Sequence, residues 1–336
     1  MPKMKLSSSI IEIIACCILI FVSLLGNAIL IYCTWKCITR RLPTSFALIF
    51  SLAFAHVVKN VVINTINISF NAGLIPNAHT CKIGLFTASV TTKLEIWFTF
   101  YLAVFYCVKL NRVVHPLRTP PNGKWRKHHL IAVVSLWFTG VAICCPYLVF
   151  GNNVQSRALL NDTDSFHHNF LYEDCHTEFP GSDVEFYYHQ IFMVITDVVP
   201  LVILVLVSLR ILVLFYEQKK ATYGNIWIGH DPSETEVLRA SKVIVLLMVI
   251  VTALWVAHFV LVFFLKYIRS WNLTSTLLVV LFSGYSSISP YLLMLINYKI
   301  SLQLRSLSSF CCANSTPKTL PTSSQKSIPE EPVTGD

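Results

Sequence analysis

Charged side chains are scarce in this sequence of 336 residues, of which only 13% are Asp, Glu, Lys or Arg and 54% are hydrophobic. A soluble chain of this length needs far more polar surface, so the composition excludes an ordinary water-soluble protein and predicts a membrane protein. The net charge of +9 raises the question of nucleic-acid binding. The basic residues, however, gather in short loops between apolar runs and form no continuous basic face, so orientation in a membrane accounts for them better.

The sequence also lacks the features that are typical of several other classes of protein. The first apolar run, about residues 10–32, is too long for a signal-peptide core, so we expect a membrane span there and no cleavable signal. We find neither an internal repeat nor matched Gly/Pro-interrupted helices, which argues against a transporter. His167, His168 and Asp164 lack metal-binding spacing. We therefore expect neither an enzyme nor a metal site or cofactor.

Seven apolar runs are long enough to cross a bilayer, which takes about 20 residues as a helix. We predict an all-α membrane protein, a seven-transmembrane helix bundle. The expected spans cover about residues 10–35, 44–70, 82–110, 130–150, 187–215, 239–265 and 275–297. Residues 1–9 precede them, residues 298–312 are expected to form a short amphipathic eighth helix, and the Ser/Thr/Pro-rich tail 313–336 is expected to be disordered.

Lys and Arg predict the orientation of this bundle in the plasma membrane. The loops after the first, third and fifth spans are basic, whereas the long loop 151–186 is acidic and contains only Arg157. Lys266 and Arg269 disagree with this pattern but are outnumbered. We therefore expect an extracellular N-terminus and a cytoplasmic C-terminus.

Three modifications fit that orientation. Asn161 begins a glycosylation sequon in the long outer loop. Among eleven cysteines, Cys81 and Cys175 alone lie clearly on the outer side, so we expect a disulfide between them. Cys311 and Cys312 follow the amphipathic stretch, where palmitoylation would attach it to the inner leaflet; two reduced thiols are an equally acceptable interpretation.

Polar residues inside the spans are candidates for function, because an ionisable group in a membrane is costly and should face the bundle interior. The second span carries a polar stripe at helical spacing, which either packs inward against neighbouring helices or contacts a ligand. The stripe consists of His56, Asn60, Asn64, Asn67 and Asn71, with Lys59 beside it.

The third span places a carboxylate among threonines. Glu95 shares a helix face with Thr91, Thr92 and Thr99. Lys93 lies roughly 200° around the helix from Glu95, so these two cannot easily pair, and we expect Lys93 to extend to the headgroups. Lys59 on the neighbouring span is the best partner for Glu95.

The fifth and sixth spans each carry one further ionisable candidate. These are Asp197, which precedes Pro200, and His258, which follows Trp255. Each of them either lines a cavity or is a satisfied interior residue.

Several short motifs resemble those of the rhodopsin-like class of G-protein-coupled receptors. "GN" at Gly26 and "HPL" at His115 match that class, and counting back from Pro116 puts Lys109 at the position of its conserved arginine. "SLAFAH" is similar to its second-span motif, with His56 in place of an aspartate. "WFTFYLAVFYCVKL" resembles the bitter taste receptors. "SPYLLM" and "LAFAH" resemble the vomeronasal type-1 receptors and related fish olfactory receptors, which the expected disulfide and sequon also favour.

This resemblance implies a chemosensory G-protein-coupled receptor that binds a small odorant or pheromone in the outer half of the bundle and activates a heterotrimeric G protein. A bitter taste receptor is the alternative, and a membrane transporter is less favoured. The expected ligand-binding residues are Glu95, Thr91, Thr92, Asp197, Trp255, His258 and Lys59. The residues expected to contact the G protein are Lys109, Arg112 and His115.

Overall fold

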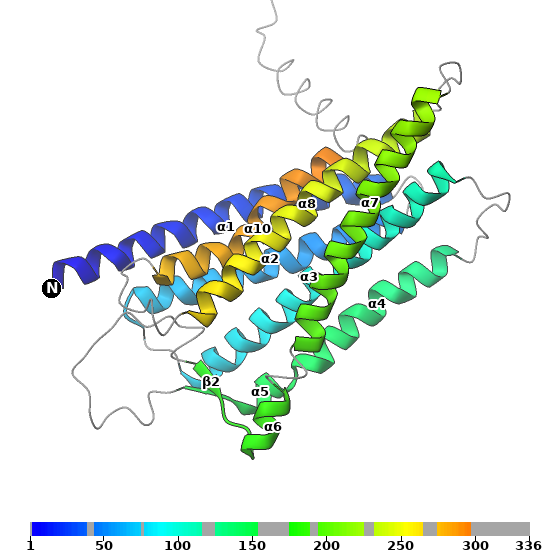
Figure 1. Cartoon of the computed structure of the whole chain (residues 1–336). Helices are drawn as coiled ribbons and strands as arrows, with labels where there is room; N and C mark the ends of the chain where they lie inside the picture. Colours follow the sequence, from blue (N-terminus) through cyan, green and yellow to red (C-terminus); the bar gives the residue numbers. More distant parts are fainter. Residues whose placement is uncertain are drawn as a thin grey trace, which may run out of the picture.

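A computed structural model shows a bundle of long helices that lie side by side (Figure 1). The structure describes residues 2–38, 44–74, 77–115, 125–153, 175–188, 194–224, 232–264 and 274–296. The long helices are α1 (Pro2–Ile38), α2 (Thr44–Asn71), α3 (Ala78–Val114), α4 (Trp125–Cys144), α7 (Val199–Gly224), α8 (Pro232–Phe263) and α10 (Thr274–Ile296). The short helix α5 (Pro146–Phe150) follows α4, α6 (Ser182–Phe186) precedes the fifth span, and a π-helical turn, Val194–Val198, leads into α7.

Seven of these helical segments are long and apolar enough to cross a membrane, so the predicted all-α class and span number are confirmed. The spans run over Ser9–Trp35, Ala47–Asn71, Ala78–Arg112, Lys127–Phe150, Val194–Gln218, Ser241–Leu261 and Thr274–Met294. The fifth span was expected from residue 187, and the described part of its apolar helix runs from Val194. The expected eighth helix, 298–312, and the tail lie outside the described residues.

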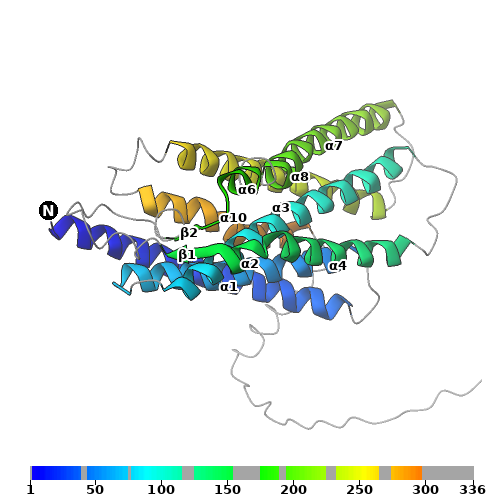
Figure 2. The same ribbon diagram turned by 90° about the horizontal axis from the view of Figure 1, so that it is seen from below.

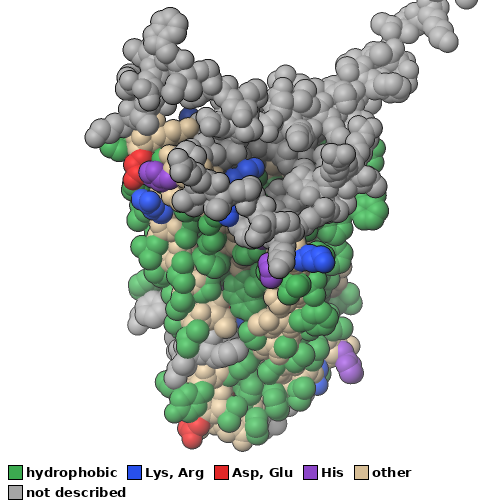
Figure 3. Space-filling view, turned by 90° about the vertical axis from the view of Figure 1, so that its right-hand side faces the viewer, with side chains coloured by type: hydrophobic (Ala, Val, Ile, Leu, Met, Phe, Trp, Pro, Cys, Tyr) green, Lys and Arg blue, Asp and Glu red, His purple; other side chains and the backbone are tan. Residues whose placement is uncertain are grey.

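The outer surface of the bundle is apolar, as a lipid-facing surface must be. Large side chains such as Phe21 and Phe138 are 68% and 73% exposed in the absence of a bilayer. Hydrophobic side chains cover the middle of the face in Figure 3, while charged side chains gather toward its ends. Because lipid is as apolar as leucine, burial of these side chains does not hold the helices together, and packing and polar contacts must do so.

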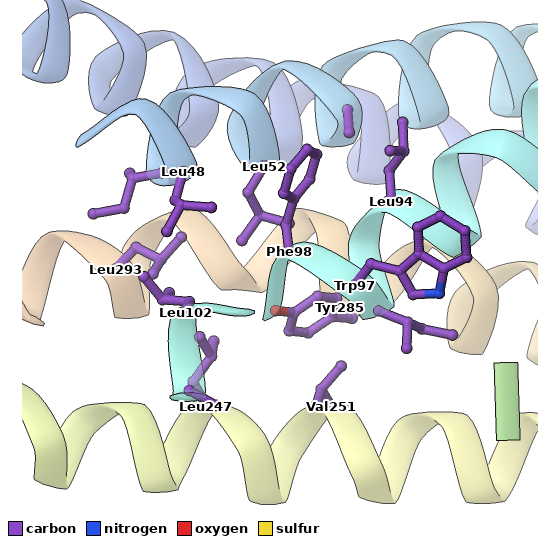
Figure 4. Packing of buried hydrophobic residues seen from close by; sticks show 14 of the residues in the cluster. Leu48, Leu52, Leu94, Trp97, Phe98, Leu102, Leu247, Val251, Tyr285 and Leu293 are labelled. Atoms are coloured by element: carbon purple, nitrogen blue, oxygen red, sulfur yellow. The ribbon is translucent and has the colours of Figure 1, made fainter. Parts of the chain in front are cut away.

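The interior is packed by side chains from α3 and the helices around it (Figure 4). Phe98 and Leu102 of α3 are buried against side chains of α2, α8 and α10 in one continuous cluster. The neighbours drawn in Figure 4 include Leu48, Leu52, Leu247, Val251, Tyr285 and Leu293. This position makes α3 the axis of the bundle, and its polar side chains are therefore the ones that meet the other helices.

A small β-structure is attached to one end of α3. Strand β1 (Gly151–Asn153) pairs antiparallel with β2 (Cys175–Thr177), and Asn153 lies opposite Cys175. A disulfide joins Cys175 to Cys81 in the first turns of α3, as expected from the sequence. Figure 2 shows the two strands near the start of α3 and on the side of the bundle where the N-terminus lies.

α1 and α10 pack closely where α1 has a glycine. A Cβ atom on Gly26 would lie 2.8 Å from Cγ of Pro290 and 2.8 Å from Cε2 of Tyr291. The hydroxyl of Tyr291 also donates to the carbonyl of Val22 at 2.8 Å. Small residues allow such close helix contact in membranes.

We predict that Gly26→Ala destabilises the protein by about 1–3 kcal/mol, because its new methyl group overlaps two rings. The measurement is thermal unfolding of the detergent-solubilised protein. The control is Gly284→Ala in α10, where an added Cβ would meet nothing within 4 Å. Equal melting temperatures for the two variants would show that the α1–α10 contact is not tight.

Candidate functional site

An ion pair between Lys59 and Glu95 lies at the centre of the bundle. Nζ of Lys59 on α2 donates to Oε2 of Glu95 on α3 at 2.6 Å, and neither side chain is exposed. The sequence indicated this pair, since Lys59 was the nearest cation on a neighbouring span. Glu95 lies fourteen residues beyond Cys81, or about 21 Å along the helix axis, so the pair is deep in the membrane-spanning region.

Aromatic side chains from α8 and α10 cover the ammonium group of Lys59. Its Nζ lies 4.1 Å from the ring centroid of Phe282 and 5.2 Å from that of Trp255. A cation over an aromatic face is stabilised by the ring quadrupole, more strongly where water is excluded. His258 packs against Trp255 with ring centroids 5.4 Å apart. The pair and its aromatic cover therefore join four helices, α2, α3, α8 and α10.

His56 lies next to the other oxygen of Glu95. Nε2 of His56 is 4.0 Å from Oε1 of Glu95, and neither atom has a hydrogen-bond partner among the described residues. Nδ1 of His56 lies 3.5 Å from the hydroxyl of Ser289, and its ring packs edge-on against Tyr285. The hydroxyl of Tyr285 in turn bonds to Thr99 at 2.8 Å. This side of Glu95 is thus polar, whereas the side of Lys59 is aromatic.

The polar stripe of α2 packs inward against serines of α10, which is the first of the two interpretations left open by the sequence. Nδ2 of Asn60 donates to the hydroxyl of Ser286 at 2.7 Å, and the hydroxyl of Ser287 donates to Oδ1 of Asn60 at 3.1 Å. The hydroxyl of Ser283 donates to Oδ1 of Asn64 at 3.2 Å. These side chains join helices, because buried polar groups in lipid must find partners within the protein.

Lys93 does not extend to the headgroups, contrary to expectation. It is fully buried and donates to Oδ1 of Asp197 and to the hydroxyl of Thr196, each at 2.8 Å. The expectation was wrong because it considered α3 alone. The face of α3 that carries Lys93 is covered by the start of the fifth span, so the lysine meets an acid there before it can reach a headgroup.

The backbone of the fifth span adds a second contact at this point. Pro200 has no N–H, so the carbonyl of Thr196, four residues earlier, loses its α-helical donor. The indole N–H of Trp97 on α3 donates to that carbonyl at 2.8 Å. The π-helical turn is a local departure from α-helical geometry that often occurs at functional positions. Lys93, which was expected at the headgroups, and Trp97, which was not singled out from the sequence, therefore both attach α3 to the fifth span.

The two threonines predicted to line the site lie about one helical turn before Glu95 on α3. The hydroxyl of Thr91 donates to the carbonyl of Thr87 in the same helix at 2.6 Å. The hydroxyl of Thr92 is buried and has no hydrogen-bond partner within the described part of the chain. Of the seven predicted ligand-binding residues, the structure thus brings Lys59, Glu95, Trp255 and His258 into one cluster and puts Asp197 in a separate pair.

The opposite end of α3 carries the residues predicted to contact a G protein. Nζ of Lys109 lies 5.9 Å from the ring centroid of Tyr106, and the lysine side chain is exposed. Nε2 of His115 lies 3.3 Å from Oε2 of Glu217, which connects this end of α3 to α7. Arg210 also approaches Glu217, at 3.6 Å. Arg112 is exposed in the last turn of α3.

Three predicted modification sites lie outside the described residues, namely Asn161, Cys311 and Cys312. Within the described ranges, no group of three or more His, Cys, Asp or Glu side chains is arranged to hold a metal ion. What the central cluster offers is a buried charge pair, aromatic faces and a few hydrogen-bonding groups. Such a cluster can recognise an organic molecule without reacting with it.

The sequence was compared with known protein families. Residues 4–312 match the family described as Taste receptor protein (TAS2R), a match that includes all seven spans. The chain belongs to this family. Its members are bitter taste receptors, which are chemosensory seven-transmembrane receptors and not enzymes. No curated protein matches the chain.

The family match supports the bitter taste receptor alternative over the vomeronasal or fish olfactory interpretation. That interpretation relied on the disulfide, on the sequon and on two short motifs. The disulfide is present in the structure, yet the whole chain matches the taste receptor family. In this chain, therefore, a bond between Cys81 and Cys175 does not separate the two receptor groups, whereas the pattern over the full set of spans does.

We predict that Glu95→Gln destabilises the protein by about 3–5 kcal/mol, because it leaves the ammonium group of Lys59 buried without its counter-charge. Surface expression of the variant should fall accordingly. The double variant Lys59→Met with Glu95→Gln should regain much of the loss. The matched control is Glu185→Gln, which removes an acid from the exposed helix α6. Normal surface expression of Glu95→Gln alone would contradict the importance of the pair.

We also predict coupling between Lys93 and Asp197. Lys93→Met and Asp197→Asn should each lower the melting temperature, and the exchanged pair Lys93→Asp with Asp197→Lys should recover part of it, with a coupling energy of about 0.5–3 kcal/mol. Lys242→Met, which removes an exposed lysine from α8, is the control. Additive effects of the two single changes would mean that the two side chains do not stabilise each other.

Proposed function

We propose that this protein is a bitter taste receptor that binds a small organic molecule in the outer half of its bundle and activates a heterotrimeric G protein. The observation that carries this proposal is the family match over residues 4–312, since it extends across every span. The vomeronasal and pheromone functions have no comparable support.

The central cluster is the proposed ligand site. Trp255 and His258 of α8, with Phe282 of α10, present aromatic faces beside the Lys59–Glu95 pair. Small-molecule sites in proteins combine mostly apolar walls with a few placed polar groups, and they often lie between the helices of a bundle. Thr91 and Thr92 are proposed to line the same site from α3, on the side of the disulfide.

The fifth span is proposed to be the moving part. The Lys93–Asp197 pair and the Trp97–Thr196 bond attach it to α3 at one end, and the His115–Glu217 contact attaches it at the other. A ligand that favours one of two packings of these helices by a few kcal/mol shifts their populations. Contacts at both ends of the same two helices can carry such a shift through the bundle.

The orientation is part of the proposal. The disulfide end is proposed to face the outside, and the end of α3 with Lys109, Arg112 and His115 to face the cytoplasm. The distribution of Lys and Arg over the loops supports it, as does the chemistry of disulfides, which persist in oxidising compartments. Glycosylation of Asn161 and palmitoylation of Cys311 and Cys312 agree with the same orientation and are proposed with it.

Lys109→Ala tests the proposed coupling. The protein would be expressed with a promiscuous G protein, and nucleotide exchange on the G protein would be measured with and without an agonist from a bitter-compound screen. We predict that Lys109→Ala changes basal exchange and lowers the agonist-stimulated rate, because Lys109 is exposed at the cytoplasmic end of α3 in the proposed orientation.

The matched control for this test is Lys82→Ala, which removes a lysine from the opposite end of the same helix. It should leave nucleotide exchange unchanged at equal surface expression. If both variants behave like the unmodified protein, Lys109 has no part in coupling. If no compound stimulates exchange by a receptor that reaches the surface, the proposed function itself is wrong.

A further inference from the structure

We infer that the ligand of this receptor presents an oxygen hydrogen-bond acceptor to the indole N–H of Trp255 and does not carry a protonated amine. The favoured compounds are therefore ketones, esters, lactones and carboxylates of small aromatic or aliphatic molecules. This inference rests on the proposed function and adds the chemical class of the ligand to it.

Among the described residues, Glu95 and Asp197 are the acids near the proposed site, and each is already paired with a lysine of the chain. Glu95 accepts from Lys59 at 2.6 Å, and Asp197 accepts from Lys93 at 2.8 Å. A protonated amine is recognised best by a carboxylate that lacks another cation. Here an entering amine would have to compete with a buried lysine for each acid, and it would add a third positive charge beside Lys59 and Lys93. The ammonium group of a ligand is therefore disfavoured by the competition for each acid and by repulsion from the two lysines.

A third buried acid, Glu12, lies in a different part of the bundle. It is on α1, and the side chains of Ser275 and Asn71 bond to it at the first turn of α10 and the end of α2. Trp255, by contrast, contacts Phe282, which lies seven residues further along α10 than Ser275, or about 10 Å along the helix axis. Glu12 therefore does not supply a negative charge to the site around Trp255.

The indole N–H of Trp255 is a hydrogen-bond donor at the proposed site that no described residue satisfies. The Trp255 side chain is buried, and Nε1 has no hydrogen-bond partner within the residues that the structure describes. The indole N–H is a donor only, and a buried donor without an acceptor is costly. The rings of His258, Phe259 and Phe282 pack around it with centroids 5.4 to 6.3 Å away. None of the described residues supplies an acceptor, and a bound ligand is our candidate for that role.

The neighbouring charge favours the same chemistry. The ammonium group of Lys59 lies 5.2 Å from the centroid of the Trp255 ring, so a ligand oxygen near Nε1 also approaches a positive group. The unpaired oxygen of Glu95 does not offset this, because it is directed to the side of His56, 4.0 Å away. Both groups next to the proposed ligand position are therefore donors, and the N–H of Trp255 is the one for which no described residue supplies an acceptor.

The experiment screens the receptor against three size-matched sets of compounds: oxygen acceptors, primary amines and plain hydrocarbons. Each active oxygen compound is then compared with the analogue in which a methylene group replaces its carbonyl. Both members are tested on the unmodified protein and on Trp255→Phe, which keeps an aromatic ring and removes the N–H. Surface expression of the variant is measured in parallel, and potency is read from the calcium response.

We expect the active compounds to come mainly from the oxygen set, and the carbonyl compound to be about tenfold more potent than its methylene analogue. In Trp255→Phe that difference should disappear, because the N–H that distinguishes the two compounds is gone. Because the result is a ratio within one variant, reduced folding of the variant does not change it. If the variant does not reach the surface, the preference of the unmodified protein for oxygen compounds over amines decides the question.

Two results would overturn the inference while leaving the receptor function intact. One is a response dominated by the amines. The other is a potency gap between carbonyl and methylene compounds that persists in Trp255→Phe, which would make Trp255 a packing residue only. If the receptor reaches the surface and no compound in any set produces a calcium response, the proposed function is contradicted and the inference fails with it.

Discussion

The bundle depends on how it accommodates two lysines in its interior. Lys59 and Lys93 are both fully buried, and removing an ammonium group from water costs several kcal/mol unless a counter-charge and hydrogen bonds replace the solvent. Glu95 supplies the counter-charge to Lys59, and Asp197 supplies the counter-charge to Lys93. Because the lysines and acids come from different helices, each pair also specifies which helices are neighbours and how they are rotated about their own axes.

The central helix α3 shows this most clearly. Lys93 and Glu95 are two residues apart and therefore point to nearly opposite sides of the helix. One side meets the fifth span at Asp197, and the other meets α2 at Lys59. A rotation of α3 by a few tens of degrees would separate both pairs at once. In lipid, where burial of apolar surface contributes little to helix association, such directional contacts decide the packing.

The same arrangement restricts what the site can recognise. Glu95 and Asp197 are each paired with a lysine, and the N–H of Trp255 beside the Lys59 ammonium has no acceptor among the described residues. Aromatic rings of α8 and α10 exclude water from this region, which strengthens each remaining electrostatic contact. The proposed ligand site, the helix packing and the connection between α3 and the fifth span therefore involve overlapping sets of side chains. A substitution in one of these sets will commonly affect the others.

Sequence reasoning reached the central pair but missed the second one. Lys59 and Glu95 could be matched because each is an ionisable residue near the middle of its span and the two spans are adjacent in the chain. Lys93 and Asp197 were considered separately, since their spans are not consecutive and nothing in the sequence states which face of α3 the fifth span covers. Pro200 was a signal that could have helped, because it predicts a carbonyl in need of a donor at Thr196. The family was also misjudged where a few short motifs and one disulfide were given more weight than the whole chain.

The sequence alone determined the membrane class, the seven spans and the cysteine pair that forms the disulfide, because these follow from local composition, helix length and the few cysteines outside the apolar runs. The tertiary structure alone decided that Lys93 is buried against Asp197, that Trp97 donates to Thr196, and that the indole N–H of Trp255 is left without an acceptor in the described chain. Each of these depends on the rotation of one helix against another. That rotation results from the packing of all the helices together and is not encoded in any single segment.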